Sequence, residues 1–279
     1  MPEGDTLYRI ANRLRPVLAG KTIVDAQANP PRTGAMIDAW SLIGQQVKLV
    51  EATGKHLLIT FNDQQVLHSH LGMTGSWHIY TPHQQWRKPI ERAGVVLKTD
   101  SHVAVNFSPK FLELVSEQAI ARNAYLRRLG PDLMLAETDV AEIFARLRRF
   151  AHLMIGEAVM NQTLVAGIGN IYKSESLFLA NLDPWTPVGV IQDDQLLAYL
   201  QLTKQLMRRN RHGGQRTTRF APDGPRLWVY QRAGQRCLVC GEYIQVCRQG
   251  EQGRTTFWCP NCQKTSRKLA AKSEEPPLT

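Results

Sequence analysis

Residues 237–262 read CLVCGEYIQVCRQGEQGRTTFWCPNC, with two Cys-x-x-Cys pairs separated by eighteen residues. Each pair can present two thiolates to one ion, and two such turns at the ends of a hairpin complete a tetrahedral site. Four sulfur ligands leave no open position, so we expect one structural zinc ion in a zinc ribbon, with disulfides or a redox dithiol as alternatives. The predicted zinc ligands are Cys237, Cys240, Cys259 and Cys262. Cys247 is left over as a spare thiol.

An arginine lies inside this hairpin, where Arg254 precedes the second cysteine pair by five residues. A hairpin held by a metal ion loses little conformational entropy when it binds a ligand, so Arg254 is suited to binding a phosphate through two hydrogen bonds. The alternative is an arginine that is only solvated. Residues 201–272 contain 15 Lys and Arg and three acidic residues, whereas residues 1–200 contain 19 of each kind. The net charge of +10 therefore belongs to the C-terminal segment. It predicts a polyanionic partner, most often nucleic acid or an anionic membrane surface, with a solvated basic surface as the alternative.

The region before the hairpin has helical periodicity, interrupted by loops rich in Gly and Pro. The predicted helices are Val140–Phe150, Gly156–Asn161, Asn170–Ala180 and Asp193–Arg209, and a strand is predicted over Leu227–Gln231.

A turn with two glycines, Gly167 and Gly169, comes directly before the helix that starts at Asn170. The start of a helix offers unpaired N–H groups and the positive end of a dipole, so this turn can hold a phosphate. Asn170 would add a side-chain donor. Tight packing between helices is the alternative interpretation.

The N-terminal region begins with a predicted helix over Gly4–Leu18 and continues in short runs rich in Val, Ile, Leu and Thr. About eight strands in this space are typical of a β-sandwich or barrel. The predicted strands are Thr22–Asp25, Gln46–Ala52, His56–Phe61, Val66–Leu71, Ser76–Tyr80, Gly94–Lys98, His102–Phe107 and Phe111–Val115.

The chain starts Met-Pro-Glu, and loss of Met1 would expose Pro2 as a secondary amine. Such an amine can attack an aldehydic sugar carbon and form an iminium ion, which acts as an electron sink for β-elimination. The adjacent Glu3 could protonate the departing sugar oxygen. Many chains begin Met-Pro, so the pair alone carries little weight.

Length and composition predict a multidomain cytoplasmic protein. The 279 residues are 43% hydrophobic and include 21 aromatic residues, which excludes a disordered chain. We find no apolar run of the roughly 20 residues that a spanning helix needs, and no apolar signal segment at the start. The predicted domains are a catalytic β-sandwich (1–117), a linker (118–131), a helical domain (132–232), a zinc finger (233–265) and a flexible tail (266–279).

Five separated motifs, in order, resemble the formamidopyrimidine-DNA glycosylase and endonuclease VIII family over nearly the whole chain. The motifs are Pro2-Glu3-Gly4, Gly54-Lys55-His56-Leu57-Leu58, His70-Leu71-Gly72-Met73, Gly167-Ile168-Gly169-Asn170-Ile171-Tyr172 and the four-cysteine ribbon. The resemblance implies an α+β protein with an N-terminal β-sandwich, a helix-two-turn-helix domain and a zinc finger. It implies a base-excision repair enzyme that is both a DNA glycosylase and an abasic-site lyase, with damaged duplex DNA bound between the domains.

The resemblance also assigns roles to single residues. It makes Pro2 the Schiff-base nucleophile and Glu3 the proton donor. It makes Lys55, Asn170 and Arg254 contacts to phosphates around the lesion, with Lys55 and Arg254 also counted among the catalytic residues, and His70 a further phosphate contact. Met73 occupies the position from which the family fills the space that an extruded base leaves. It implies a monomer that binds DNA at the nucleoid, with zinc and no small-molecule cofactor.

The finer pattern favours the endonuclease VIII branch, which removes oxidised pyrimidines. The purine-acting branch carries Asp-Pro-Arg-Arg-Phe where this chain has Ser108-Pro109-Lys110-Phe111. The loop between the helices and the zinc finger also looks short for one that caps an oxidised purine. The stretch His70–Met73 resembles the purine branch, so oxidised purines are the alternative substrate. Thr6 replaces a second acidic residue that is common in the family, and Asp5 lies beside it.

Two hypotheses from other classes compete with the enzyme. A noncatalytic DNA-binding protein could use the same helix turn and zinc ribbon, and it would bind lesions without cleaving the strand. A proline-based tautomerase would leave the basic C-terminal segment without a use.

Overall fold

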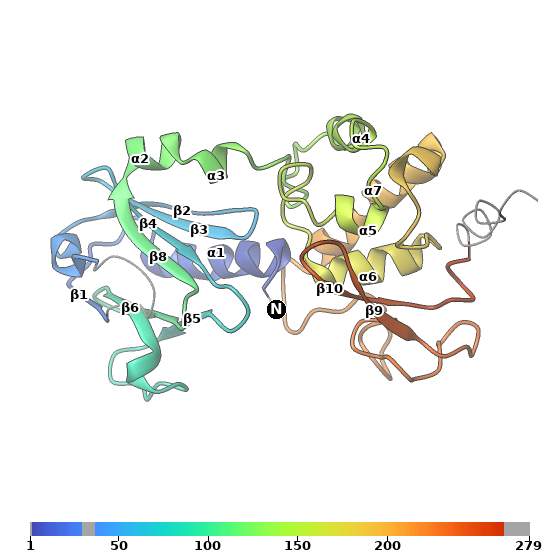
Figure 1. Cartoon of the computed structure of the whole chain (residues 1–279). Helices are drawn as coiled ribbons and strands as arrows, with labels where there is room; N and C mark the ends of the chain where they lie inside the picture. Colours follow the sequence, from blue (N-terminus) through green and yellow to red (C-terminus); the bar gives the residue numbers. More distant parts are fainter. Residues whose placement is uncertain (1, 30–36, 265–279) are drawn as a thin grey trace, which may run out of the picture. The chain divides into compact units, whose positions relative to one another are not determined.

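The computed structural model describes residues 2–29 and 37–264, and the chain divides into two compact units, Met1–Leu129 and Gly130–Thr279. The tail that we predicted to be flexible, 266–279, lies outside the described residues. Figure 1 shows the first unit in blue to green and the second in green to red. No helix in the described part of the chain is long and apolar enough to cross a membrane.

The first unit is a β-sandwich of two four-stranded antiparallel sheets, as predicted. One sheet has the order β2-β3-β4-β8 and the other β1-β6-β7-β5. The strands are β1 (Asp25–Ala28), β2 (Val47–Thr53), β3 (His56–Phe61), β4 (Gln65–His70), β5 (Ser76–Tyr80), β6 (Ala93–Lys98), β7 (Val103–Phe107) and β8 (Phe111–Ser116). Two 3-10 helices, η1 (Ala39–Leu42) and η2 (Ile90–Arg92), lie in the connections.

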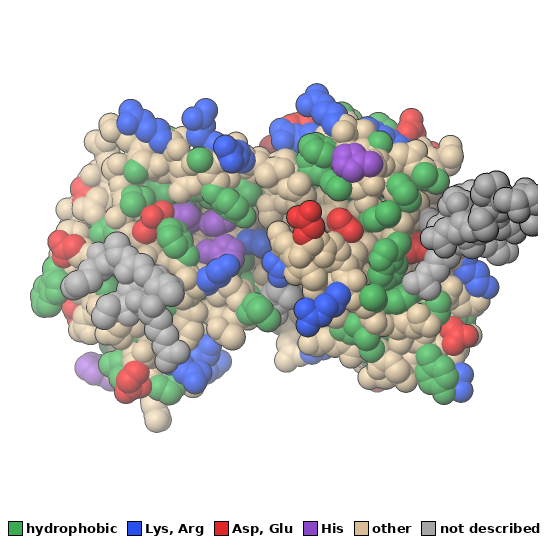
Figure 2. Space-filling view, in the orientation of Figure 1, with side chains coloured by type: hydrophobic (Ala, Val, Ile, Leu, Met, Phe, Trp, Pro, Cys, Tyr) green, Lys and Arg blue, Asp and Glu red, His purple; other side chains and the backbone are tan. Residues whose placement is uncertain are grey.

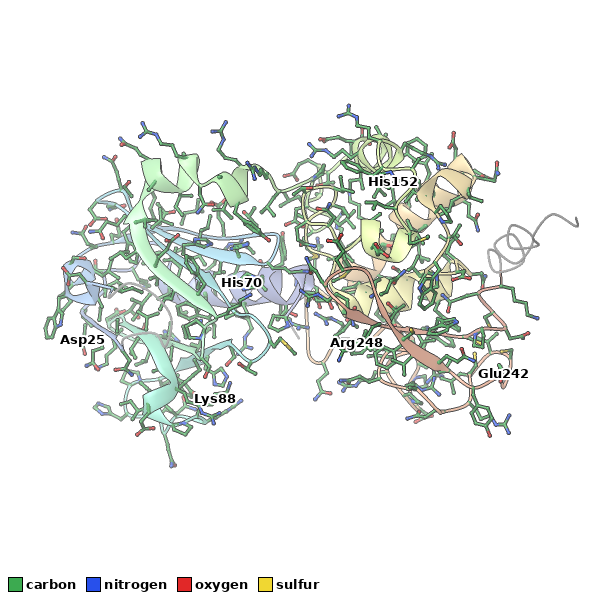
Figure 3. The ribbon with its side chains drawn as sticks, viewed as in Figure 1. Asp25, His70, Lys88, His152, Glu242 and Arg248 are labelled. Carbon is green, nitrogen blue, oxygen red and sulfur yellow. The ribbon has the colours of Figure 1, made fainter. Side chains whose placement is uncertain are left out.

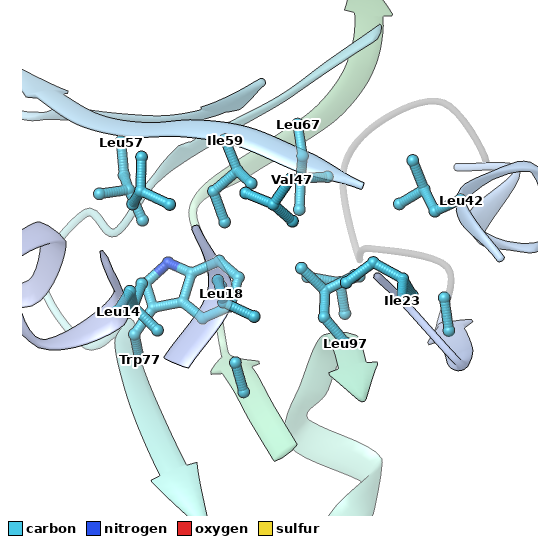
Figure 4. Packing of buried hydrophobic residues seen from close by; sticks show 14 of the residues in the cluster. Leu14, Leu18, Ile23, Leu42, Val47, Leu57, Ile59, Leu67, Trp77 and Leu97 are labelled. Atoms are coloured by element: carbon cyan, nitrogen blue, oxygen red, sulfur yellow. The ribbon is translucent and has the colours of Figure 1, made fainter. Parts of the chain in front are cut away.

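The core of this unit forms because alternate strand residues point inward, where the helix α1 (Gly4–Leu18) also contributes its apolar face. Leu14 and Leu18 of α1 pack with Leu57 and Ile59 of β3 and with Trp77 of β5 (Figure 4). All but Trp77, at 5%, are at most 1% exposed. Burial of an apolar side chain contributes about 1.5–3 kcal/mol, so this cluster holds the C-terminal half of α1 against the sandwich, and Leu7 in the first turn of α1 belongs to the same core.

Two short helices, α2 (Glu117–Arg122) and α3 (Ala124–Arg127), occupy much of the segment 118–131 that we predicted as a linker, and α2 begins one residue before it. Each has a side-chain cap at its N-terminus: the Ser116 hydroxyl accepts from Ala119 N at 3.1 Å, and the Asn123 amide oxygen accepts from Tyr125 N at 3.0 Å. Ser and Asn satisfy N–H groups that the first turn of a helix leaves unpaired.

Between residues 130 and 264, the described part of the second unit, the chain forms four α-helices and a two-stranded hairpin. They are α4 (Val140–Arg148), α5 (Ile155–Ala158), α6 (Asn170–Leu179) and α7 (Asp193–Arg209), with η3 (Val188–Val190), and the strands β9 (Gln245–Gln249) and β10 (Arg254–Trp258). The helix α6 is buried from Asn170 to Phe178, polar residues included. A helix buried on all sides needs a partner for each of its polar side chains, and those partners define the site described below.

Two predicted strands differ in the structure. The strand predicted over Thr22–Asp25 lies at Asp25–Ala28, where it pairs with β6, and Thr22 makes an isolated bridge to Gln46. The strand predicted over Leu227–Gln231 is wrong, since this segment is a bend and a turn. Its backbone N–H groups bind a carboxylate on α6 instead of a neighbouring strand.

Candidate functional site

The N-terminal residues Pro2 and Glu3 stand directly before α1. Pro2 is half-buried and Glu3 is fully buried, with the Glu3 carbonyl accepting from Thr6 N at 2.9 Å and from Leu7 N at 3.2 Å. These bonds fix the backbone of Glu3 as the first residue before the helix. Asp5 is also fully buried and accepts a hydrogen bond from the Thr6 hydroxyl at 3.2 Å. The terminus is therefore a positioned group.

Lys55 and His70 lie at one end of the β2-β3-β4-β8 sheet. Gly54 has φ +57°, a left-handed conformation that favours glycine, and it forms the tight turn that carries Lys55. The next residue, His56, pairs with His70 across β3 and β4, so the two predicted phosphate contacts are close together (Figure 3 labels His70). Figure 2 shows the histidine side chains of this face beside Lys or Arg side chains.

His70 is neutral at pH 7 and has a defined tautomer. Burial, with Lys110 and Lys55 nearby, lowers the pKa of His70 from 6.5 to about 4. Gly72 N donates to His70 Nδ1 at 3.1 Å. A neutral imidazole that accepts at Nδ1 carries its proton on Nε2, so His70 can donate to an anion from Nε2.

Met73 lies in the loop between β4 and β5 and is 73% exposed. Its loop closes when Gly75 N donates to Leu71 O at 3.0 Å. Gly72 has φ +63°, and a Cβ there would lie 2.7 Å from Lys110 Cβ, so only glycine fits the position. The loop backbone is therefore rigid, and it presents a flexible apolar side chain. A side chain of this kind is suited to filling the space that an extruded nucleobase leaves.

In the second unit, the glycine turn before α6 is held by Gln162. The Gln162 side chain accepts from Gly167 N at 3.1 Å and donates to Ile168 O at 3.0 Å. Gly167 has φ +94°, which a residue with a side chain rarely adopts. The start of α6 is thus preorganised.

Side chains on one face of α6 bind the backbone of β10. Asn170 Nδ2 donates to Thr255 O at 2.6 Å, and Lys173 Nζ donates to Thr255 O at 3.3 Å and to Thr256 Oγ1 at 2.7 Å. Asn170 is 4% exposed and Lys173 is fully buried. These bonds bring the predicted phosphate contact Asn170 next to the predicted contact Arg254. An amide nitrogen has two hydrogens, so Nδ2 can also donate to a phosphate.

Arg254 is exposed at the start of β10, where its Nε donates to Gln252 Oε1 at 3.3 Å. The hairpin turn behind it is held by Gly253 N, which donates to Gly250 O at 2.9 Å. The structure therefore brings together Lys55 and His70 in the first unit, and Asn170 and Arg254 in the second.

Glu175 is a residue that the sequence analysis missed. It is fully buried on α6, and its carboxylate accepts from the backbone N of Trp228, Val229 and Tyr230, each at 2.8 Å, and from the Thr218 hydroxyl. It anchors the loop between α7 and the hairpin. The sequence carried no clear signal for this role, because α6 also contains the polar residues Asn170, Lys173, Ser174 and Ser176.

Replacing Glu175 with glutamine should destabilise the second unit strongly. The glutamine amide nitrogen would face backbone N–H groups that now donate to an oxygen, so we expect a loss of about 3 kcal/mol. Thermal unfolding of the variant would measure it. The matched control is Glu242→Gln, because the exposed Glu242 side chain accepts a single backbone N–H, from Tyr243 at 2.8 Å. Equal melting temperatures for the two variants would contradict the anchoring role.

The four predicted zinc ligands converge in the structure, with their sulfur atoms within 4.8 Å of one another. Cys237 Sγ lies 3.8 Å from Cys262 Sγ, and Cys240 Sγ lies 3.4 Å from Cys259 Sγ. A tetrahedral site with Zn–S bonds of about 2.3 Å has sulfur atoms about 3.8 Å apart, so the cluster fits one ion. All five cysteines are free thiols, and Cys247 is exposed on β9, away from the cluster.

Comparison with known protein families gives matches over both units. Residues 1–110 match the formamidopyrimidine-DNA glycosylase N-terminal domain, and residues 129–221 match the formamidopyrimidine-DNA glycosylase H2TH domain.

Two curated relatives are similar over nearly all of their lengths. A Streptomyces coelicolor protein named "Probable endonuclease 8 2" is 37% identical over 94% of each chain. The DNA-(apurinic or apyrimidinic site) lyase Nei2 of Mycolicibacterium smegmatis is 35% identical over 95% of this chain and 100% of its own.

Solved structures share the fold. The Lactococcus lactis Fpg in complex with DNA that contains N7-benzyl-Fapy-dG has a TM-score of 0.79 at 24% identity, covering 95% of this chain and 100% of that one. The same protein bound to DNA with an abasic site has a TM-score of 0.78 at 24% identity, covering 94% and 100%.

Proposed function

This chain belongs to the formamidopyrimidine-DNA glycosylase and endonuclease VIII family, and on that premise we propose that it removes oxidised pyrimidines through Pro2. It is a DNA glycosylase with abasic-site lyase activity that acts in base-excision repair. The observation that carries the proposal is the positioned N-terminus, with Pro2 half-buried beside a fully buried Glu3.

The proposed reaction starts at the amine of Pro2, which removal of Met1 exposes. Its nitrogen attacks C1′ of the damaged nucleotide, the base leaves, and Glu3 protonates the sugar oxygen as the ring opens. The resulting iminium has no N–H to lose and accepts the electron pair that is left when a C2′ proton departs. The phosphate on the 3′ side leaves in this β-elimination, and δ-elimination releases the phosphate on the 5′ side. Water then hydrolyses the iminium and restores the amine.

Four side chains are the proposed contacts to the DNA backbone. They are Lys55, His70, Asn170 and Arg254. Enzymes that act on a base in duplex DNA extrude it, at a cost of a few kcal/mol of lost stacking. Contacts to phosphates on both sides of the lesion would stabilise the bent backbone, and Met73 would fill the vacated position. The excess of basic residues in 201–272 would add a salt-sensitive attraction to DNA.

We propose zinc as the ion of the cysteine cluster. Four thiolates would hold the ion, those of Cys237, Cys240, Cys259 and Cys262. A site with four sulfur ligands would stabilise the hairpin and would leave no open coordination position for a reaction. The hairpin carries Arg254, so the ion would act on DNA binding through that side chain.

The preference for oxidised pyrimidines rests on two observations. The chain has Ser108-Pro109-Lys110-Phe111 where the purine branch has Asp-Pro-Arg-Arg-Phe. Two curated relatives are named endonuclease 8 or Nei2. Oxidised purines remain the alternative because of the His70–Met73 stretch. One chain contains every proposed site residue, so we propose a monomer that works on damaged duplex DNA at the nucleoid, in the cytoplasm.

A panel of duplexes with one lesion each tests this proposal. Borohydride should trap the chain covalently on duplexes that contain thymine glycol, dihydrouracil or an abasic site. We expect cleavage at thymine glycol to be at least about tenfold faster than at 8-oxoguanine opposite cytosine. Undamaged duplex is the control. Faster cutting of 8-oxoguanine would reverse the branch assignment, and binding without trapping or cleavage would favour a noncatalytic DNA-binding protein.

A further inference from the structure

Three histidines share the outer face of the β2-β3-β4-β8 sheet, and the proposed reaction uses one of them. His56 lies on β3, and His68 and His70 lie on β4. Their sequence neighbours Leu57 and Leu67 point inward to the sandwich core. Side chains of a strand alternate between its two faces, so the histidines stand together on the opposite side.

Two of these histidines and a glutamate form a hydrogen-bonded chain. His68 Nδ1 lies 2.9 Å from Glu113 Oε1, and His68 Nε2 lies 2.8 Å from His56 Nδ1. A carboxylate accepts, so His68 Nδ1 carries a proton and its Nε2 accepts the proton on His56 Nδ1. His56 is then left with a bare lone pair on Nε2. That atom is buried and has no hydrogen-bond partner among the described residues.

This hydrogen-bonded chain of side chains is surrounded by several helices and strands. His56 and His68 are 7% and 2% exposed. The His56 ring lies 4.9 Å from the His70 ring on β4 and 5.2 Å from the Tyr125 ring on α3, and the His68 ring lies 5.2 Å from Phe111 on β8. The ionisable groups that face the chain are Lys55 on the β2–β3 turn, His70 on β4, Lys110 before β8, Glu113 on β8 and Tyr125 on α3.

In the free protein, these surroundings keep His56 and His70 uncharged. Burial, then repulsion from His70, His68 and Lys55, lowers the pKa of His56 from 6.5 to about 3. The pKa of His70 is about 4 for similar reasons. A phosphate bound at Lys55 and His70 would cancel the repulsion from the lysines and raise both pKa values.

We propose that Glu113, His68 and His56 are positioning residues for the phosphate-binding edge at Lys55 and His70, and that DNA binding there draws one proton from solvent into their chain. The inference rests on the proposed function, which places a DNA phosphate at that edge. The proton adds to Nε2 of His56, and the proton on His56 Nδ1 passes to Nε2 of His68. His56 stays neutral and becomes a donor at Nε2, while the charge comes to rest on His68, 2.9 Å from the Glu113 carboxylate.

Calorimetry of DNA binding tests the proposal directly. The probe is a duplex with a tetrahydrofuran abasic analogue, titrated at constant salt in buffers of different ionisation enthalpy. We expect the wild-type chain to take up about one proton at pH 6.5, and the Kd to increase about tenfold from pH 5.5 to pH 6.5. The sign follows because, above about pH 3, the free His56 does not hold the extra proton, whereas the complex holds it in the hydrogen-bonded chain, so raising the pH disfavours the complex. At high pH the uptake disappears.

The decisive variant is Glu113→Gln, which keeps the shape of the side chain and removes the charge that neutralises His68. Proton uptake should be lost, and the Kd at pH 8 should match wild type, whereas a merely structural defect would weaken binding at every pH. The control is Glu117→Gln, since Glu117 pairs with Lys48 at 3.5 Å and takes no part in the hydrogen-bonded chain of Glu113, His68 and His56. It should keep the uptake.

The outcomes separate this inference from the proposed function. Tight binding by wild type without proton uptake, or uptake that persists in Glu113→Gln, overturns the inference alone. A wild-type chain that neither binds the probe nor is trapped by borohydride on an abasic duplex overturns the proposed function, and the inference with it.

Discussion

A tag fused in front of Pro2 should abolish borohydride trapping and reduce strand cleavage by about a thousandfold or more, as expected when a covalent nucleophile is removed. The fusion converts the proline nitrogen into an amide, which has no lone pair available for attack on C1′. Cleavage of an abasic duplex in single-turnover experiments measures the loss. DNA affinity should change little, because the proposed phosphate contacts are other residues.

The same tag placed after Thr279 is the matched control, and it should leave trapping intact. A second variant, Pro2→Gly, keeps an amine at the terminus but makes it primary. Its iminium can lose the N–H proton and become a neutral imine, so we expect reduced, not abolished, cleavage. Full activity of the N-terminally tagged chain would show that another residue is the nucleophile.

Replacing Cys259 with serine should remove the metal and weaken binding to an abasic duplex by about a hundredfold or more. Cys259 is fully buried, and its Sγ lies 3.4 Å from Cys240 Sγ in the cluster. Without the ion, the two cysteine pairs would lose the link that ties them together at the end of the hairpin. The same hairpin holds Arg254 and accepts the hydrogen bonds from Asn170 and Lys173. Metal content by elemental analysis and DNA binding by fluorescence anisotropy measure the two effects.

Cys247→Ser is the control, because this thiol is exposed on β9 and lies outside the cluster. It should keep one zinc ion per chain and the wild-type affinity. A Cys259→Ser chain that still binds DNA as tightly as wild type would contradict the structural role that we give to the ion.

The fold was predictable where the controlling pattern is local. The cysteine spacing, the strand alternation from β2 to β8 and the helix over Gly4–Leu18 were all read correctly, because ligand spacing and side-chain periodicity are properties of adjacent residues. The strand predicted over Leu227–Gln231 failed for the complementary reason. Its β-rich composition was local, but its backbone donors bind Glu175, 54 residues away from Val229.

The candidate site shows the same division. Pro2, Glu3, Lys55, His70, Met73, Asn170 and Arg254 could be named from motifs, and their roles stay predictions. The contacts that hold them could not be named. The bond from Asn170 to Thr255 spans 85 residues, and the bond from His68 to Glu113 spans 45. No spacing rule links residues so far apart in the chain.

The sequence by itself thus determined the family, the sandwich, the four cysteines that cluster and the residues proposed to meet DNA. Only the tertiary structure decided how those residues are held: a buried lysine and asparagine join α6 to the hairpin, a glutamate anchors a loop, and two hydrogen-bonded histidines lie behind the proposed phosphate-binding edge. The physical reason is that a buried polar group must find a partner, and folding, not sequence position, chooses which one.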